Sequence, residues 1–191
     1  SEYLHHVEAV KAKGTLRINR SILKAFLQFT GDVSLPKLTP LLVDRYKAER
    51  LGRVSPVTVN IELRALRAAF NQAVRWGMIE TNPFSKVQLA SVPEALPRYF
   101  TKEDFQKLLS VTKEGWLRDV VIFAVLTGMR RGEILNLRWQ DVDLERRVVR
   151  IQSSATFRTK TGRRRTIPLG DTAYHLLQSR HGKSPSEYVF T

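Results

Sequence analysis

The chain has 191 residues, of which 42% are hydrophobic and 26% charged, a composition that is typical of a folded globular protein and excludes a disordered one. Cysteine is absent, which excludes disulfides and thiolate metal sites, and the spacing of the four histidines indicates no metal site either. The net charge is +14, and 21 of the 32 basic residues are arginines, so we expect a nucleic acid or another phosphate polymer as partner.

The first 82 residues are predicted to be helical throughout. A helix that begins near Thr15 ends at Gly31, and a proline at the first helical position opens each of the two helices that follow. The expected helices cover 15–30, 41–51 and 56–76. In the last of them, apolar residues at three- and four-residue spacing predict a buried stripe: Val59, Leu63, Leu66, Phe70 and Ala73.

A polar stripe follows another face of the helix expected over 56–76. It consists of Asn60, Arg64, Arg67, Asn71 and Arg75, and its arginines have no acidic partner four residues later. Two interpretations stay open, because such a stripe is either a solvated face or a face that lies against DNA. The candidate DNA-binding residues here are Arg64, Arg67 and Arg75.

A break in periodicity divides the chain in two. Residues 83–98 contain three prolines and no helical period, which indicates a linker between a domain over 1–82 and a second over 99–191. The second domain opens with a helix whose start, at Thr101, resembles a capping box. The apolar run 120–126 has the composition of a strand, but its helical surroundings favour a fully buried helix.

Strand composition replaces the helical period after Trp139. The expected strands cover 147–152, 155–160 and 164–169, with Thr161-Gly162 as a hairpin-like turn between the last two. Asp171 or Thr172 then caps another helix. The predicted fold class is therefore mainly α with a small antiparallel sheet.

Two segments carry chemistry. In the first, a glycine turn follows the apolar run and places Arg130 at the start of a helix, with Glu133 one turn later in a position to orient it. The second is the predicted hairpin, which is narrow enough to enter a DNA groove. It carries five basic residues: Arg158, Lys160, Arg163, Arg164 and Arg165.

The chain resembles the tyrosine recombinases, the phage-integrase family. Their first arginine box resembles the stretch TGMRRGEILNLRWQDVD, and their lysine-bearing hairpin, with its Arg-x-x-Pro-Leu ending, resembles TKTGRRRTIPL. The predicted helices of the first domain resemble the family's SAM-like core-binding domain. The resemblance implies this helical domain followed by an α+β catalytic domain.

The resemblance also implies a reaction: site-specific cutting and rejoining of DNA through a 3′-phosphotyrosyl intermediate, with no cofactor or metal. By the family pattern, Arg130 is the first catalytic arginine, Glu133 supports it, and Lys160 protonates the 5′-oxygen that leaves. Spacing alone does not decide between Arg130 and Arg131. The four hairpin arginines are candidate DNA-binding residues.

The family's second box, His-x-x-Arg, and its nucleophilic tyrosine are not found in this sequence. We therefore expect a truncated chain that binds DNA without cleaving it, because it holds about half of a cooperating active site. Tyr188 is a poor nucleophile candidate, since its surroundings resemble the stretch before the second box. The alternative is a non-catalytic DNA-binding protein that retains the recombinase fold.

The expected partner is double-stranded DNA, held between the two basic domains. The resemblance implies a tetramer on paired sites for the full-length protein, whereas we expect this fragment to be monomeric. No apolar run is long enough to span a membrane, and no signal pattern begins the chain. The expected location is the cytoplasm, with the nucleoid if the source is bacterial or phage.

Overall fold

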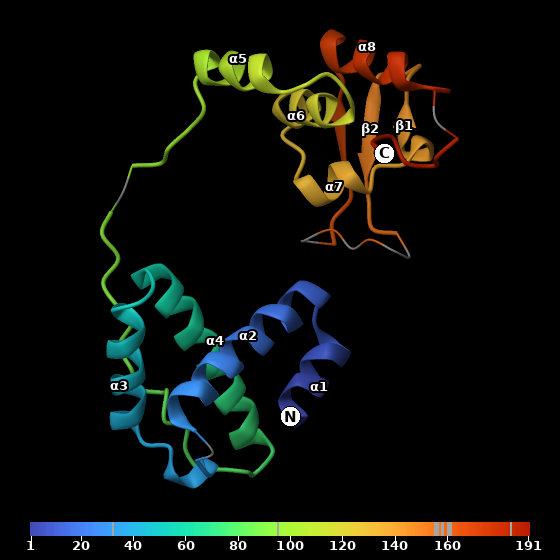
Figure 1. Ribbon diagram of the computed structural model, residues 1–191. Coiled ribbons are helices and arrows are strands. Elements are labelled where there is room, and N and C mark those ends of the chain that lie inside the picture. The colour runs from blue at the N-terminus through green and yellow to red at the C-terminus, as the bar shows by residue number, and fades with distance from the viewer. Residues whose placement is uncertain (32, 95, 155–156, 158, 160–161, 184) are drawn as a thin grey trace. The chain divides into compact units, whose positions relative to one another are not determined.

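The structure is a computed structural model of residues 1–191 and describes all of them except 32, 95, 155–156, 158, 160–161 and 184. Two compact units follow one another along the chain, Ser1–Leu96 and Pro97–Thr191 (Figure 1). Each unit has its own hydrophobic core. Within the described part of the chain, no helix is both long and apolar enough to cross a bilayer.

The first unit is helical, as predicted. Its elements are α1 (Glu2–Val10), α2 (Lys13–Thr30), the 3-10 turn η1 (Leu35–Lys37), α3 (Pro40–Leu51) and α4 (Pro56–Arg75). The proline starts of α3 and α4 are confirmed. The side chains of Thr39 and Ser55 each accept a backbone N–H at 3.3 Å, which caps the two helices.

Aromatic rings fill the core of the first unit. Phe26 of α2 meets Tyr46, Phe70 and Phe84 edge-on, with ring centroids 5.1–6.1 Å apart. The predicted apolar stripe of α4 is buried in this core along its whole length. The face of α4 that packs into the core is therefore the one that the spacing of its apolar residues predicted.

Three of the five residues in the polar stripe of α4 have a role that neither interpretation of the sequence foresaw, because they bind the chain's own segment 82–90. Arg67 donates from Nε to the Phe84 carbonyl at 2.9 Å and from Nη2 to the Val87 carbonyl at 2.6 Å. Its guanidinium is thus engaged with the backbone of the same unit. The structure gives Arg67 a structural contact where DNA contact was expected.

Two asparagines of the same stripe continue this binding. Asn60 donates to the Ala90 carbonyl at 2.9 Å and accepts the Ala90 N–H at 2.8 Å. Asn71 accepts from the amide of Asn82 at 2.7 Å. The Asn60 amide thus supplies the hydrogen bonds that the backbone N–H and C=O of Ala90 would otherwise make in a helix or a sheet.

The segment expected to begin the linker therefore packs on the first unit. Phe84 and Val87 are 0% and 6% exposed and belong to the core of that unit. The expected boundary at residue 82 precedes the residues that complete the core. Periodicity missed them because 82–90 is irregular, with a turn over 83–86, and is held by single side chains from another element.

The second unit combines helices with a three-stranded antiparallel sheet, which confirms the predicted fold class. Its helical elements are α5 (Lys102–Val111), α6 (Trp116–Thr127), α7 (Arg131–Leu135), η2 (Trp139–Asp141) and α8 (Asp171–Arg180). Its strands, in the order β1-β2-β3, are β1 (Val142–Asp143), β2 (Val148–Ile151) and β3 (Arg165–Pro168). Helix α6 packs between α7 and α8 at the sheet (Figure 1).

One of the three expected strands differs. The strands expected over 147–152 and 164–169 form β2 and β3, and they pair with each other. The third described strand is β1, which the sequence did not predict, and most of the strand expected over 155–160 lies outside the described residues. In that stretch Thr159 bonds to a side chain instead of a strand ladder, since its N–H donates to the Ser153 hydroxyl at 3.2 Å.

Two further details of the second unit differ from what the sequence predicted. The run 120–126 is helical, as favoured, but it is not fully buried, because Val125 and Leu126 are 59% and 48% exposed. Gly170 is the residue before α8, so Asp171 and Thr172 lie inside its first turn and neither caps it.

We predict that Asn60→Ala frees the end of the 82–90 segment. Both bonds to Ala90 are lost, at a cost of about 1–3 kcal/mol of the free energy of unfolding. Hydrogen exchange of the Ala90 amide measures this directly and should become faster. Arg64→Ala, an exposed change on the same helix, is the control and should stay within about 0.5 kcal/mol; equal protection of Ala90 in all three proteins would contradict the role of Asn60.

Candidate functional site

The glycine turn predicted between two helices is present and places Arg130 at the head of α7. Helix α6 ends at Gly128, whose φ of 62° is the left-handed conformation that favours glycine. Met129 then enters the core, 5% exposed, and anchors the turn. Arg130 follows as the residue before α7, with its side chain 52% exposed.

Glu133 lies one turn into α7 and contacts Arg130 twice. Its Oε2 accepts the backbone N–H of Arg130 at 2.9 Å, and its Oε1 accepts Nη1 of the same residue at 3.2 Å. This is the orienting role expected for Glu133, and the structure records no such contact for its neighbour Arg131 among the described residues. The assignment of Arg130 as the catalytic arginine stays a prediction, which its contact with Glu133 supports.

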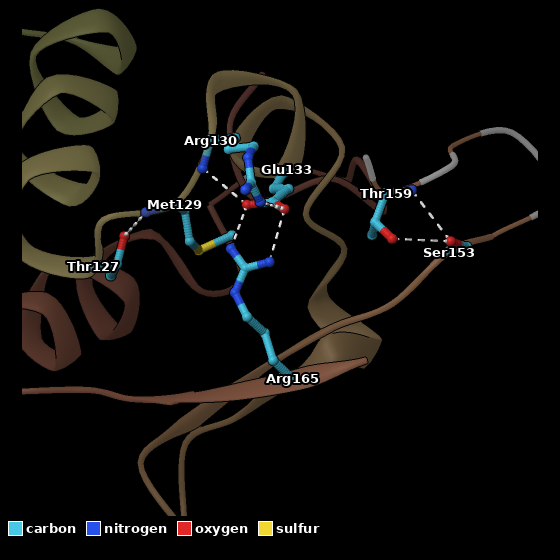
Figure 2. A network of polar contacts seen from close by, with 7 residues as sticks. All are labelled: Thr127, Met129, Arg130, Glu133, Ser153, Thr159 and Arg165. Atoms are coloured by element: carbon cyan, nitrogen blue, oxygen red, sulfur yellow. Dashed lines mark hydrogen bonds and ion pairs between the residues drawn. The ribbon is translucent and has the colours of Figure 1, made fainter. Parts of the chain in front are cut away.

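A second arginine reaches Glu133 from the sheet. Arg165, the first residue of β3, donates from Nη1 to Oε1 at 2.9 Å and from Nη2 to Oε2 at 2.6 Å. Figure 2 shows the side chains of Arg130 and Arg165 converging on this carboxylate from different elements. We call these three residues the Glu133 cluster.

Arg165 is expected from the sequence to bind DNA with its neighbours, which stays a prediction, and in the structure its guanidinium bonds to Glu133. It pairs with Ile151 in the sheet register, and Ile167 and Leu169 follow it at the two-residue period of a strand face. An arginine in phase with two apolar residues of a strand points toward the core. The two-residue spacing of Arg165, Ile167 and Leu169 could have been read from the sequence, but the run of three arginines suggested a common role for all three.

The surroundings of Glu133 hold it ionised. Its side chain is 2% exposed, and a carboxylate at such depth is costly unless it is paired. The Arg165 guanidinium, with help from the N–H and side chain of Arg130, lowers the pKa of Glu133 to about 2 despite its burial. The same pairing raises the pKa of Arg165.

The loop that leads from β2 to β3 is anchored beside this cluster. Thr159 is 3% exposed and its N–H donates to the Ser153 hydroxyl, so it holds the first residues of the loop (Figure 2). The ring of Phe157 lies against α7, where a Cβ at Gly132 would be 3.4 Å from its Cε2. The loop is therefore attached to the helix that carries Glu133.

The remaining predicted residues divide into three groups. Lys160, which directly follows Thr159, and Arg158 lie outside the described residues. Arg163 and Arg164 are exposed and directly precede Arg165. On α4 of the first unit, Arg64 and Arg75 are exposed.

The Glu133 cluster has one net positive charge, because two guanidinium groups surround one carboxylate. Arg130 uses a single side-chain donor toward the described residues, and its guanidinium has five. An oriented, half-exposed guanidinium with donors to spare is suited to a phosphate or another oxyanion. The cluster can thus stabilise negative charge that develops on a bound phosphate.

Comparison with known proteins gives matches over both units. Residues 98–191 match the model of the phage integrase family, and residues 1–89 match that of the phage integrase SAM-like domain. The shufflon-specific DNA recombinase of Escherichia coli is 33% identical over 156 residues, 76% of this chain and 39% of that protein. Tyrosine recombinase XerC of Thermodesulfovibrio yellowstonii is 27% identical over 186 residues, 93% of this chain and 60% of that protein. The chain therefore spans about two to three fifths of the length of these relatives.

Solved structures show the same fold. A lambda integrase dimer bound to a COC′ core site superposes with a TM-score of 0.79 at 21% identity, over 100% of this chain and 72% of that chain. The Tn1549 transposon integrase in complex with transposon right end DNA gives 0.74 at 20% identity, over 99% and 69%. At these identities the likeness establishes the fold of the chain.

The state of Glu133 predicts an acid dependence of stability. Its pKa is lowered from 4.5 to about 2 in the folded chain, so its contribution to the free energy of unfolding is complete above about pH 4.5. That contribution, on the order of 3 kcal/mol, is lost as the pH falls from 4.5 toward 2. In a carbon-13 NMR titration the Glu133 carboxyl should stay ionised at pH 3, and a midpoint near 4.5 would contradict the paired geometry.

Proposed function

Because the chain belongs to the tyrosine recombinase family, we propose that it is the DNA-holding part of a site-specific recombinase and that Arg130 binds the phosphate to be cut. The full protein would join DNA strands through a 3′-phosphotyrosyl intermediate. The observation that carries this proposal is the Arg130 guanidinium, oriented by a buried carboxylate and still half exposed.

The chemistry explains why an arginine is needed at this point. A tyrosine oxygen attacks the scissile phosphorus, the bond to the 5′-oxygen breaks, and the phosphate becomes linked to the tyrosine. The 5′-hydroxyl of another strand then attacks the same phosphorus and releases the tyrosine, so the number of phosphodiester bonds is conserved. The phosphorus passes through a crowded state with extra negative charge, which a fixed guanidinium stabilises.

Lys160 is proposed to give a proton to the 5′-oxygen as it leaves. The packing of Phe157 against Gly132 of α7 supports this, because Phe157 is three positions before Lys160 in the sequence. The nucleophile and the second arginine box are proposed to lie outside this sequence. The chain alone would then bind DNA and leave it uncut.

The proposed partner is double-stranded DNA, contacted by both units. The exposed arginines that we propose for phosphate contact are Arg64, Arg75, Arg163 and Arg164. One structural neighbour is a lambda integrase tetramer bound to a Holliday junction, and we propose a tetramer on paired sites for the full protein, acting in the cytoplasm. The chain by itself is proposed to be monomeric.

Strand cleavage tests the proposed function. The full-length gene product is incubated with a nicked DNA substrate that carries its recombination site, and denaturing gels then reveal any covalent protein–DNA adduct. We expect an adduct from the full-length protein and none from the 191-residue chain. Tight binding without any adduct from the full-length protein would instead support a DNA-binding protein that has lost catalysis.

Arg130→Ala should separate chemistry from binding in the full-length protein. The loss of one donor to the developing charge lowers the cleavage rate on the order of 100-fold or more, whereas most of the affinity for DNA comes from other phosphate contacts. Adduct formation at saturating DNA and fluorescence anisotropy measure the two effects. Parallel losses of rate and affinity would contradict the role assigned to Arg130.

Salt dependence identifies the phosphate contacts of the loop. Arg163→Ala and Arg164→Ala should each weaken binding on every DNA sequence and reduce the slope of log K against log salt by about 1. Arg146 is the control because it is exposed in the β1–β2 turn, at the other end of β2 from this loop. Arg146→Ala should leave the slope unchanged, and an equal change in all three variants would indicate only a loss of net charge.

A further inference from the structure

We propose that Arg165 is a positioning residue: by holding both oxygens of Glu133, it leaves the Arg130 guanidinium available for the DNA phosphate. This inference rests on the proposed function of Arg130 and gives another role to a residue that the sequence placed among the candidate DNA contacts of the hairpin. Its basis is the two-pronged contact between Arg165 and Glu133, at 2.9 and 2.6 Å.

The donors around Glu133 are divided unequally between the two arginines. Arg165 gives two side-chain donors in the parallel geometry that is strongest between guanidinium and carboxylate. Arg130 gives its backbone N–H at 2.9 Å, which fixes its main chain, and a single longer side-chain bond at 3.2 Å. The carboxylate thus accepts four bonds from the two residues, about the number that its lone pairs allow.

Removal of Arg165 would change what Arg130 can do. The buried carboxylate would keep its charge and lose its stronger partner, and the nearest guanidinium among the described residues would be that of Arg130. Arg130 could then turn both of its prongs to Glu133, and the pair would have no net charge. A phosphate would meet a neutral pair in place of a cluster with one positive charge.

The exposed fractions of the three side chains agree with a role for Arg165 in holding Glu133 and for Arg130 in binding phosphate. Glu133 is 2% exposed, Arg165 35% and Arg130 52%, so the cluster is graded from the buried carboxylate to the open guanidinium. Arg163 and Arg164, the two residues directly before β3, are exposed. We therefore separate the three consecutive arginines by role, two as phosphate contacts and the third as internal support.

The first experiment separates positioning from DNA contact. In the 191-residue chain, Arg165→Gln added to Arg130→Gln should leave the salt slope of DNA binding at the value of Arg130→Gln alone, because Arg165 acts only through Arg130, whereas Arg164→Gln should reduce the slope by about 1. In the full-length gene product, Arg165→Gln should lower the cleavage rate at saturating DNA on the order of 100-fold, because a small displacement of a catalytic group has that effect. A slope below that of Arg130→Gln alone, or an unchanged rate, would overturn the proposal.

A compensating variant tests the mechanism. Glu133→Gln combined with Arg165→Gln removes the charge that would capture Arg130, so the double variant should cleave at least about tenfold faster than Arg165→Gln alone. If Arg165→Gln fails to fold, Arg165→Met takes its place in both the single and the double variant, since it removes the charge and keeps an unbranched apolar side chain. Circular dichroism establishes that each variant is folded at the assay temperature, and Arg146→Gln should match the parent in rate.

The outcomes are distinct. A double variant that is no faster than the folded single variant would show that Arg165 does not act through Glu133, and the inference would fail while the role of Arg130 stands. A parent protein that forms no covalent adduct would refute the proposed function itself, before any variant is compared. Recovery in the double variant, with no further change of the salt slope when Arg165→Gln is added to Arg130→Gln, would establish the positioning role.

Discussion

One buried carboxylate between two guanidinium groups organises the second unit. Glu133 is ionised at a depth where an unpaired charge would be severely destabilising, and Arg165 supplies the stronger pairing. The contact ties α7 to β3, and the Phe157 ring on Gly132 ties the loop before β3 to the same helix. Because these attachments meet at α7, the head of that helix becomes a rigid place from which Arg130 faces solvent.

Net charge indicates the partner but does not map the binding surface. Several arginines of this strongly basic chain serve the fold: Arg67 binds the segment 82–90, Arg50 pairs with a buried Glu62, and Arg180 pairs with Asp119. Each gives the interior a fork of donors where backbone carbonyls or carboxylates need partners. The surface available to the proposed DNA partner is therefore smaller than a count of basic residues implies, and it must be assigned residue by residue.

Local patterns predicted what depends on neighbours in sequence, and failed where a partner comes from another element. The proline-capped helices, the apolar stripe of α4 and the Arg130–Glu133 pair all act within one turn of helix. The partner of Glu133 at Arg165 is 32 positions away, and no helical period connects them. Its two-residue phase with Ile167 was the available clue. The binding of 82–90 by Asn60 and Arg67 left no such clue, because an irregular segment that is neither helix nor strand has no period.

The most direct measurement is a crystal structure of the chain bound to a DNA duplex that contains its recombination site. The proposed site requires one backbone phosphate within hydrogen-bond distance of the Arg130 guanidinium, with Nζ of Lys160 at the same phosphate and Arg165 still on Glu133. A complex in which Arg130 and Lys160 contact different phosphates, or in which Arg130 contacts none, would contradict it.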